Sequence, residues 1–167
     1  MPNHDAINDQ TFLRQAIELS RHALEDEGKT PFGALVVIDN QIIGEGTSSV
    51  IELRDPSAHA EIMALRHAGQ RLNRHLMPDA TIYCSSQPCP MCLIACYWAR
   101  LNRVVYAATI DDTALNGFED LQLYRLLRND PNDRPLPEYA DRDLRTDATD
   151  ILTAWTRTLP EPVVPKL

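Results

Sequence analysis

Apolar residues recur at helical spacing near the start of the chain, with Phe12 and Ala16 among them. This periodicity predicts a helix over residues 9–27, with Asp9 as its candidate N-cap and Gly28 as its stop. A helix with one apolar stripe needs a surface to cover, so we expect it on one face of a β-sheet.

Two runs of β-branched and apolar residues follow, at 33–38 and 41–45. Asp39-Asn40 between them consists of residue types that tolerate the positive φ angles of tight hairpin turns. We therefore expect two antiparallel strands joined by a two-residue turn. The next stretch, 46–56, is polar and predicts an irregular loop.

Helical and strand patterns then alternate up to residue 109. The sequence predicts a helix over 57–68 that begins at the N-cap Ser57, a strand over 81–85, a helix over 90–100 and a strand over 104–109. This alternation favours a mixed α/β sheet with right-handed crossovers.

The last third of the chain has a weaker pattern. A Leu-rich stretch predicts a helix over 120–128, a Pro-rich loop follows over 129–137, and a short helix is expected over 147–157. Residues 159–167 contain three prolines, which predicts an extended arm because proline fits neither a helix interior nor a central strand.

Composition narrows the class of protein. With 167 residues the chain has the size of one globular domain. No segment reaches the roughly 18 consecutive apolar residues of a membrane helix, and the polar N-terminal segment lacks a secretory pattern, so we expect a cytoplasmic protein. The net charge of −8 disfavours a nucleic-acid partner, because it repels a phosphate backbone, and favours a small-molecule substrate.

Metal-ligand residue types are concentrated in two short motifs, His-Ala-Glu at 59–61 and Pro-Cys-Pro-Met-Cys at 88–92. Each motif opens a predicted helix, where unpaired N–H groups stabilise thiolates and developing negative charge. One imidazole and two thiolates, from His59, Cys89 and Cys92, form a set that zinc favours. Three such ligands leave the fourth tetrahedral position open, which is typical of a catalytic zinc site.

Glu61 distinguishes catalysis from structural metal binding. A carboxylate that lies beside a zinc ion without binding it can accept a proton from the coordinated water, and a purely structural site has no need of one. His-x-Glu followed by Pro-Cys-x-x-Cys is the signature of zinc-dependent nucleobase deaminases, in which the Glu shuttles protons. The sequence therefore predicts hydrolytic deamination.

Other uses of the cysteines are weighed against this interpretation. All four lie between Cys84 and Cys96, too close together for a disulfide scaffold. An iron–sulfur loop and a structural zinc site with four cysteines are the alternatives, but no distant fourth cysteine is present for the cluster. For Cys84 and Cys96 we favour small buried side chains. A zinc-stabilised module without catalysis remains the non-enzymatic alternative.

These motifs resemble the cytidine-deaminase-like superfamily and, within it, the bacterial guanine deaminases, from about Phe12 to Trp155. The resemblance implies an α/β fold, a three-layer αβα sandwich with a five-stranded mixed sheet, one zinc ion per subunit and a homodimer. It also implies a single domain over 1–167, in which 129–167 form a C-terminal extension that covers the neighbouring subunit's site. Further matching segments are Pro31-Phe32-Gly33, Asp55-Pro56, Tyr97-Trp98-Ala99-Arg100, Gly117-Phe118 and Ala154-Trp155.

The resemblance further implies which residues bind the substrate. In guanine deaminases an acidic residue after the fourth strand helps to bind the base and relay protons, and Asp112 stands at the matching position. The other residues that we expect beside the ring are Phe32, Ser48, Ala60, Pro88 and Trp98.

Three departures from the guanine deaminase pattern concern the substrate. Ser48 stands where an Asn hydrogen-bonds the base, and a hydroxyl does not offer the paired donor and acceptor of an amide. Gln87 stands where a Glu usually precedes Pro-Cys, and the proline-rich arm replaces a C-terminal aromatic residue. We therefore expect deamination of a small free nucleobase, guanine first, with guanosine, ammeline-like triazines, cytosine and adenosine in tRNA as alternative substrates.

Overall fold

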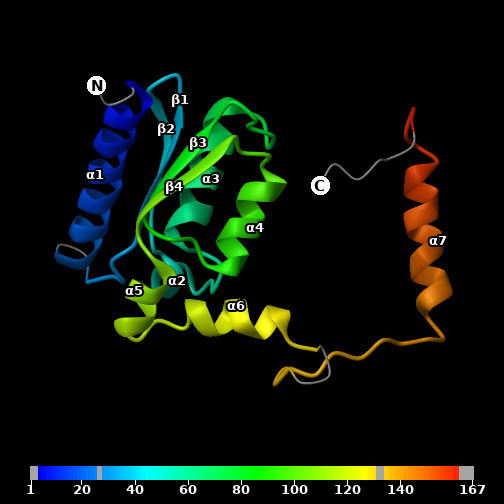
Figure 1. The fold of residues 1–167 in the computed structure, drawn as a ribbon. Coiled ribbons are helices and arrows are strands. Elements are labelled where there is room, and N and C mark those ends of the chain that lie inside the picture. Colours follow the sequence, from blue (N-terminus) through cyan, green and yellow to red (C-terminus); the bar gives the residue numbers. More distant parts are fainter. Residues whose placement is uncertain (1–3, 26–27, 131–133, 162–167) are drawn as a thin grey trace. The chain divides into compact units, whose positions relative to one another are not determined.

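The computed structural model describes residues 4–25, 28–130 and 134–161 (Figure 1). The chain divides into two compact units, Met1–Arg128 and Asn129–Leu167. The sheet and the helices α1 to α6 belong to the first unit, and α7 belongs to the second.

The sheet has four strands in the order β2-β1-β3-β4. β1 pairs antiparallel with both β2 and β3, whereas β3 and β4 run parallel. This arrangement confirms the predicted mixed α/β sheet. The strands are β1 (Gly33–Ile38), β2 (Gln41–Thr47), β3 (Thr81–Ser86) and β4 (Arg103–Ala108).

The expectation of a fifth strand is wrong for the part of the chain that the structure describes, because the sheet there ends at β4. After β4 the chain forms α5 (Ile110–Leu115) and then α6 (Asp120–Arg128). The stretch 110–128 has few β-branched residues and many good helix formers, so its local preference is helical. The predicted helix over 120–128 is confirmed.

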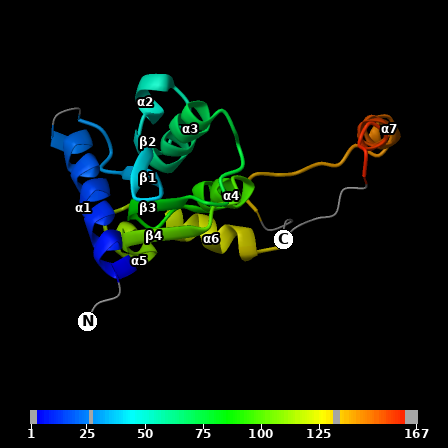
Figure 2. The same cartoon turned by 90° about the horizontal axis from the view of Figure 1, so that it is seen from above.

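Helices cover both faces of the sheet, giving helix, sheet and helix layers (Figure 2). α1 (His4–Glu25) packs on one face against β1 and β3. α3 (Ala60–Leu72) packs on the other face, mainly against β2, and contacts α4 (Pro90–Trp98).

Successive residues of β1 contribute to two different hydrophobic cores, because side chains alternate across a strand. Ala34 and Val36 belong to the core under α3 and α4, whereas Leu35 and Val37 belong to the core under α1. All four side chains are buried. A continuous apolar run is what a strand needs when helices cover both of its faces.

α1 begins before Asp9, so the expectation that Asp9 caps it is wrong. The Asp9 carboxylate instead accepts hydrogen bonds from the Tyr83 hydroxyl at 2.7 Å and from Arg103 at 2.6 Å, which tie the helix to β3 and β4. Gly28 has a φ of +63°, a conformation typical of the residue after a helix. Residues 26–27, at the predicted end of the helix, lie outside the described residues.

The hairpin between β1 and β2 has the predicted two-residue turn, with φ angles of 48° at Asp39 and 60° at Asn40. Farther along β2, glycine is required at Gly46, because a Cβ there would clash with the backbone oxygen of Ala60. The first turn of α3 therefore lies directly against the backbone of β2, which fixes where this helix begins.

The second unit contains α7 (Arg145–Thr156), whose bounds differ by one or two residues from those of the predicted helix over 147–157. This helix has no buried residues, and Ile151, Leu152 and Trp155 are exposed. Most of the predicted arm at 159–167 lies outside the described residues. Among the helices of the described ranges, none is both long and apolar enough to cross a membrane.

Candidate zinc centre and its cavity

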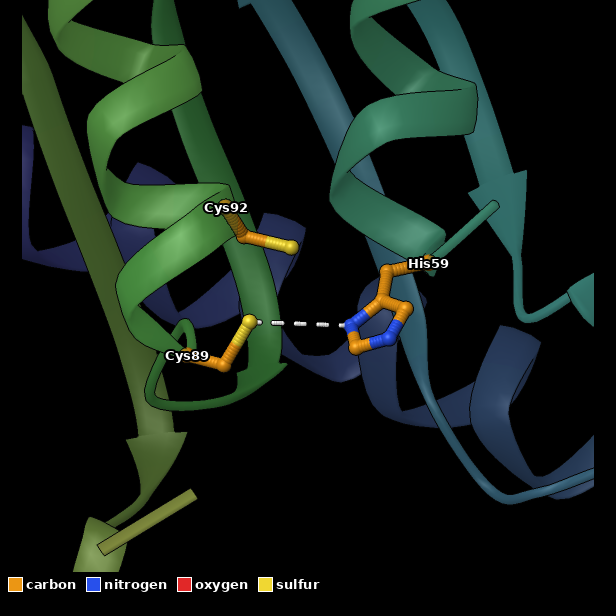
Figure 3. A group of neighbouring side chains, drawn as sticks. All are labelled: His59, Cys89 and Cys92. Carbon is orange, nitrogen blue, oxygen red and sulfur yellow. Dashed lines mark hydrogen bonds between the residues drawn. The ribbon is translucent and has the colours of Figure 1, made fainter. Parts of the chain in front are cut away.

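Three side chains from two helix starts converge in the first unit (Figure 3). The ligand atoms of His59, Cys89 and Cys92 all lie within 4.8 Å of one another. His59 Nδ1 is 3.7 Å from Cys89 Sγ. The structure thus brings together the three residues that the sequence predicts as metal ligands.

The side chains of His59 and Cys89 are not used to cap the helices that they begin. His59 and Cys89 are the N-cap residues of α3 and α4, with extended backbones (φ −71° and −64°), and neither side chain caps its own helix. Pro90 occupies the first turn of α4, where its fixed φ suits the start of a helix. α3 begins at Ala60, so Ser57 is not the N-cap that we expected. The N–H and the hydroxyl of Ser57 instead donate to the Asp55 carboxylate at 2.8 and 2.6 Å.

Hydrogen bonds among the three residues set their charges. The bond from Cys92, together with the bond to His59, lowers the pKa of Cys89 to about 4, so this sulfur is a thiolate at neutral pH. The same bond to Cys89, together with burial, raises the pKa of Cys92. The hydrogen bond to Cys89 also raises the pKa of His59. A divalent cation would displace the proton of Cys92 and lie beside the thiolate, because metal ligation requires deprotonated sulfur and neutral imidazole.

The donor set fits zinc, which binds imidazole nitrogen and thiolate sulfur and tolerates an open fourth position. Cys84 and Cys96 are buried in the core under α3 and α4, where burial raises the pKa of Cys84 and brings that of Cys96 to about 12. Among the described residues, neither belongs to a group that could hold a metal. This placement disagrees with both a four-cysteine zinc site and an iron–sulfur loop.

Glu61 lies in the first turn of α3, two positions after His59, and is 7% exposed. Burial raises the pKa of Glu61 above the ordinary value of a glutamate. A carboxyl group whose pKa is shifted toward neutrality can both accept and donate a proton near pH 7.

A cavity of about 440 Å³ opens beside these residues, within the size range of small-molecule sites. We call its end at His59, Glu61 and Cys89 the floor. Its wall continues through the loop before β1, through α2 (Val50–Leu53) and around the start of α6. α2 is a single helical turn within the stretch that the sequence predicts as an irregular loop.

The expected substrate contacts divide into two groups. Phe32, Ser48 and Ala60 line the cavity. Pro88 is fully buried and is not part of the cavity wall, and its carbonyl oxygen accepts a hydrogen bond from the Tyr124 hydroxyl at 2.8 Å. Pro88 therefore helps to anchor α6.

Trp98 and Asp112 are not among the residues that line this cavity in the described part of the chain. Trp98 is the last residue of α4, at the other end of the helix from Cys89, and is 72% exposed. The Asp112 carboxylate accepts hydrogen bonds from the N–H and the hydroxyl of Thr109, each at 2.7 Å, and so caps α5. These bonds lower the pKa of Asp112, which makes it a poor proton carrier near neutrality.

Phe118 and Asp120, to which the sequence analysis gave no role, also line the cavity. The Phe118 ring packs edge to face against Phe32, with ring centroids 4.8 Å apart. Burial, and then the negative charge of Cys89, raise the pKa of Asp120. In the sequence, the Gly117-Phe118 pair was the signal for a turn at this place. Gly117 adopts a φ of +87° just before α6 begins.

Comparisons with known proteins identify a family and several similar proteins. Residues 6–108 match the family described as the cytidine and deoxycytidylate deaminase zinc-binding region. The guanine deaminase of Bacillus subtilis (strain 168) is 41% identical over 133 residues, which are 80% of this chain and 85% of that protein. A tRNA-specific adenosine deaminase of Buchnera aphidicola subsp. Schizaphis graminum is 38% identical over 110 residues, 66% of this chain and 72% of that protein.

A solved structure extends the similarity beyond the matched family region. The X-ray structure of the guanine deaminase from Bacillus subtilis superposes with a TM-score of 0.85 at 36% identity. The superposition covers 96% of this chain and 98% of the other.

Proposed function

Because the chain belongs to the cytidine and deoxycytidylate deaminase family, we propose that it is a zinc-dependent hydrolase that removes the exocyclic amino group of a small nucleobase. The first substrate that we propose is guanine, which reacts with water to give xanthine and ammonia. The convergence of His59, Cys89 and Cys92 beside a cavity that also contains the buried Glu61 carries this proposal.

The reaction replaces the C2–N bond of guanine with a C2–O bond. When bound by these three residues, zinc supplies a coordinated water whose pKa is lowered to roughly 7. Glu61 accepts one proton from the attacking water and donates it to a ring nitrogen. It then accepts the second proton, from the new hydroxyl on C2, and donates it to the amino group, which leaves as ammonia while the C2–N bond breaks. The first-turn N–H groups of α3, that of Ala60 included, stabilise the negative charge that develops on the ring.

Asp120 takes the role that the sequence analysis gave to Asp112. Its carboxyl lines the cavity and has a raised pKa, mainly because of burial, whereas Asp112 is exposed and occupied in capping α5. A carboxyl group in this position can accept a hydrogen bond from a ring N–H or exchange a proton with the leaving amine.

The remaining wall suits a flat ring. Phe32 and Phe118 supply apolar contact, and the Ser48 hydroxyl, in a side chain that is 7% exposed, supplies one hydrogen bond. An apolar cavity with a few polar groups is the usual form of a small-molecule site.

The substrate is tested by ammonia release from guanine, guanosine, ammeline, cytosine and an adenosine-containing tRNA stem-loop. We expect the highest kcat/KM for guanine, and we expect a chelator to abolish ammonia release until zinc is restored. Deamination of tRNA adenosine is the second candidate because of the Buchnera relative, but the net charge of −8 opposes binding of a polyanion. Reaction with the stem-loop alone would contradict the free-base proposal, and zinc binding without any ammonia release would favour a non-enzymatic module.

The proposal includes a cytoplasmic homodimer in which residues 129–167 cover the neighbouring subunit's site. Exposed apolar side chains on α7, such as Trp155, and on α4, such as Trp98, support it because such surfaces gain stability when covered. The four free cysteines suit a reducing compartment. Light scattering should give twice the chain mass, and deletion of 129–167 should lower kcat/KM for guanine while zinc stays bound.

A further inference from the structure

Two segments of the cavity wall are joined by an ion pair for which the proposed reaction has no use. Lys29 Nζ lies 2.9 Å from Glu52 Oε2. Lys29 belongs to the loop before β1 and Glu52 to α2, and both residues line the cavity. The pair therefore connects parts of the wall that belong to different segments of the chain.

Exposure places this pair toward the solvent end of the cavity, which we call the mouth. Glu61 at the floor is 7% exposed, whereas Ile51 in α2 is 84% exposed. The Glu52 side chain is 53% exposed and the Lys29 side chain 16% exposed. A ring whose amino-bearing carbon lies at the floor therefore has its opposite end near α2 and Lys29.

α2 is held in position by the backbone hydrogen bond from the Ser49 N–H to the Ala58 carbonyl at 2.8 Å and by this ion pair. It is a single turn with no buried residues, and it ends at Arg54 in the left-handed conformation (φ 51°). An isolated turn gains too little from its own hydrogen bonds to be stable in water. The ion pair to Lys29 ties this turn to a side chain that is mostly shielded from solvent.

We propose that the Lys29–Glu52 ion pair determines substrate specificity by closing the mouth over a free base and excluding the corresponding nucleoside. This inference rests on the proposed deamination of guanine. When the C2 amino group lies at the floor, the imidazole ring, which carries the sugar in a nucleoside, points to the mouth. A ribose there requires the pair to stay open, so the apparent affinity for guanosine falls with the open fraction.

Competition between guanosine and guanine tests the pair. The inhibition constant of guanosine is measured against ammonia release from guanine in Lys29→Met, in Glu52→Gln and in the charge-reversed double variant K29E/E52K. A partly exposed ion pair is weak, so each single variant should lower the ratio of guanosine Ki to guanine KM by about fivefold. The reversed pair should restore the ratio. Arg74→Met is the matched control, because it breaks a 2.6 Å ion pair with Asp79 away from this cavity.

A ratio that stays at the wild-type value in both single variants would overturn the inference. A lowered ratio that the reversed pair fails to restore would also overturn it, since separate contacts and not the pair would then set the specificity. Failure of the proposed function is distinguishable, because the wild-type protein would then release no ammonia from guanine, and the specificity proposal would fall with it.

Discussion

The floor of the cavity and its mouth are held in place in different ways. At the floor, His59 and Cys89 stand at the N-cap positions of α3 and α4, and α3 packs directly on the sheet. At the mouth, Glu52 belongs to a single turn without buried residues and is linked to Lys29 by an ion pair.

This difference separates the chemistry from the choice of substrate. The position of the floor follows from the backbone of two helices and from a closely packed core, which tolerates little displacement. The position of the mouth depends on a weak, partly exposed interaction that salt and single substitutions can alter. Changes at the floor should therefore abolish the reaction, whereas changes at the mouth should alter its selectivity.

The largest effect is expected from Cys92→Ala at the floor. Loss of a thiolate ligand should remove zinc, measured as metal per chain, and lower ammonia release by at least about 10³-fold. Cys96→Ala is the matched control, since it changes a buried cysteine on the same helix that contributes to the core and not to the metal group. It should keep zinc and lose about 1 kcal/mol of stability. Full zinc content in Cys92→Ala would contradict this assignment.

Asp120→Asn should lower kcat/KM for guanine by about 100-fold, because it removes a carboxyl group that exchanges protons. Asp112→Ala should leave kcat/KM close to the wild-type value and lower the midpoint of urea unfolding slightly, because it removes a helix cap. Steady-state kinetics and urea unfolding measure both. The opposite result, with Asp112→Ala inactive and Asp120→Asn active, would restore the assignment made from the sequence.

Gly46→Ala tests whether packing of α3 positions the floor. The new Cβ would clash with the Ala60 backbone, so the free energy of unfolding should fall by about 1–3 kcal/mol and zinc should bind more weakly. Gly69→Ala on α3 is the control, because its Cβ would meet the Arg74 backbone oxygen only at 3.3 Å. Its expected change is within about 1 kcal/mol, as measured by urea unfolding. Equal zinc affinities in both variants would show that this packing contact does not position the floor.

The smallest effect is expected from salt at the mouth. Raising the ionic strength to about 1 M shortens the screening length to about 3 Å and weakens an exposed ion pair. The ratio of guanosine Ki to guanine KM should fall by about twofold in the wild-type protein, in proportion to the modest strength of such pairs. Lys29→Met should show no such fall, since it has no pair to screen. An equal fall of this ratio in both proteins would show that salt acts at a site other than the Lys29–Glu52 pair.

The hydrophobic pattern predicted the strands and most helices because it reflects burial. The run at β1 alternates between two cores, and the hairpin turn at Asp39-Asn40 has the positive φ angles that its residue types allow. The fifth strand came from the resemblance and not from the pattern, which predicts no strand beyond 104–109. α5 is too short for periodicity to reveal, although Thr109 and Asp112 form a capping box that has a sequence signature.

The metal ligands could be predicted because each motif lies within one helix start, where spacing fixes geometry. Asp120 could not be assigned in this way, because its place depends on the turn at Gly117 and on the docking of α6 through the bond from Tyr124 to the Pro88 carbonyl. Position after a strand pointed to Asp112, but local hydrogen bonding engages that carboxylate in a cap. Single side-chain links such as Lys29–Glu52 leave no periodic pattern in the sequence.

Replacement of Glu61 tests the central claim most directly, because this residue separates a catalytic zinc centre from a structural one. Zinc content and ammonia release from guanine are measured on the same samples of wild-type protein and Glu61→Gln. We predict one zinc ion per chain in both proteins and a turnover at least about 10³-fold lower in the variant, as expected for loss of a general acid and base. Wild-type turnover in Glu61→Gln with zinc bound would contradict the account.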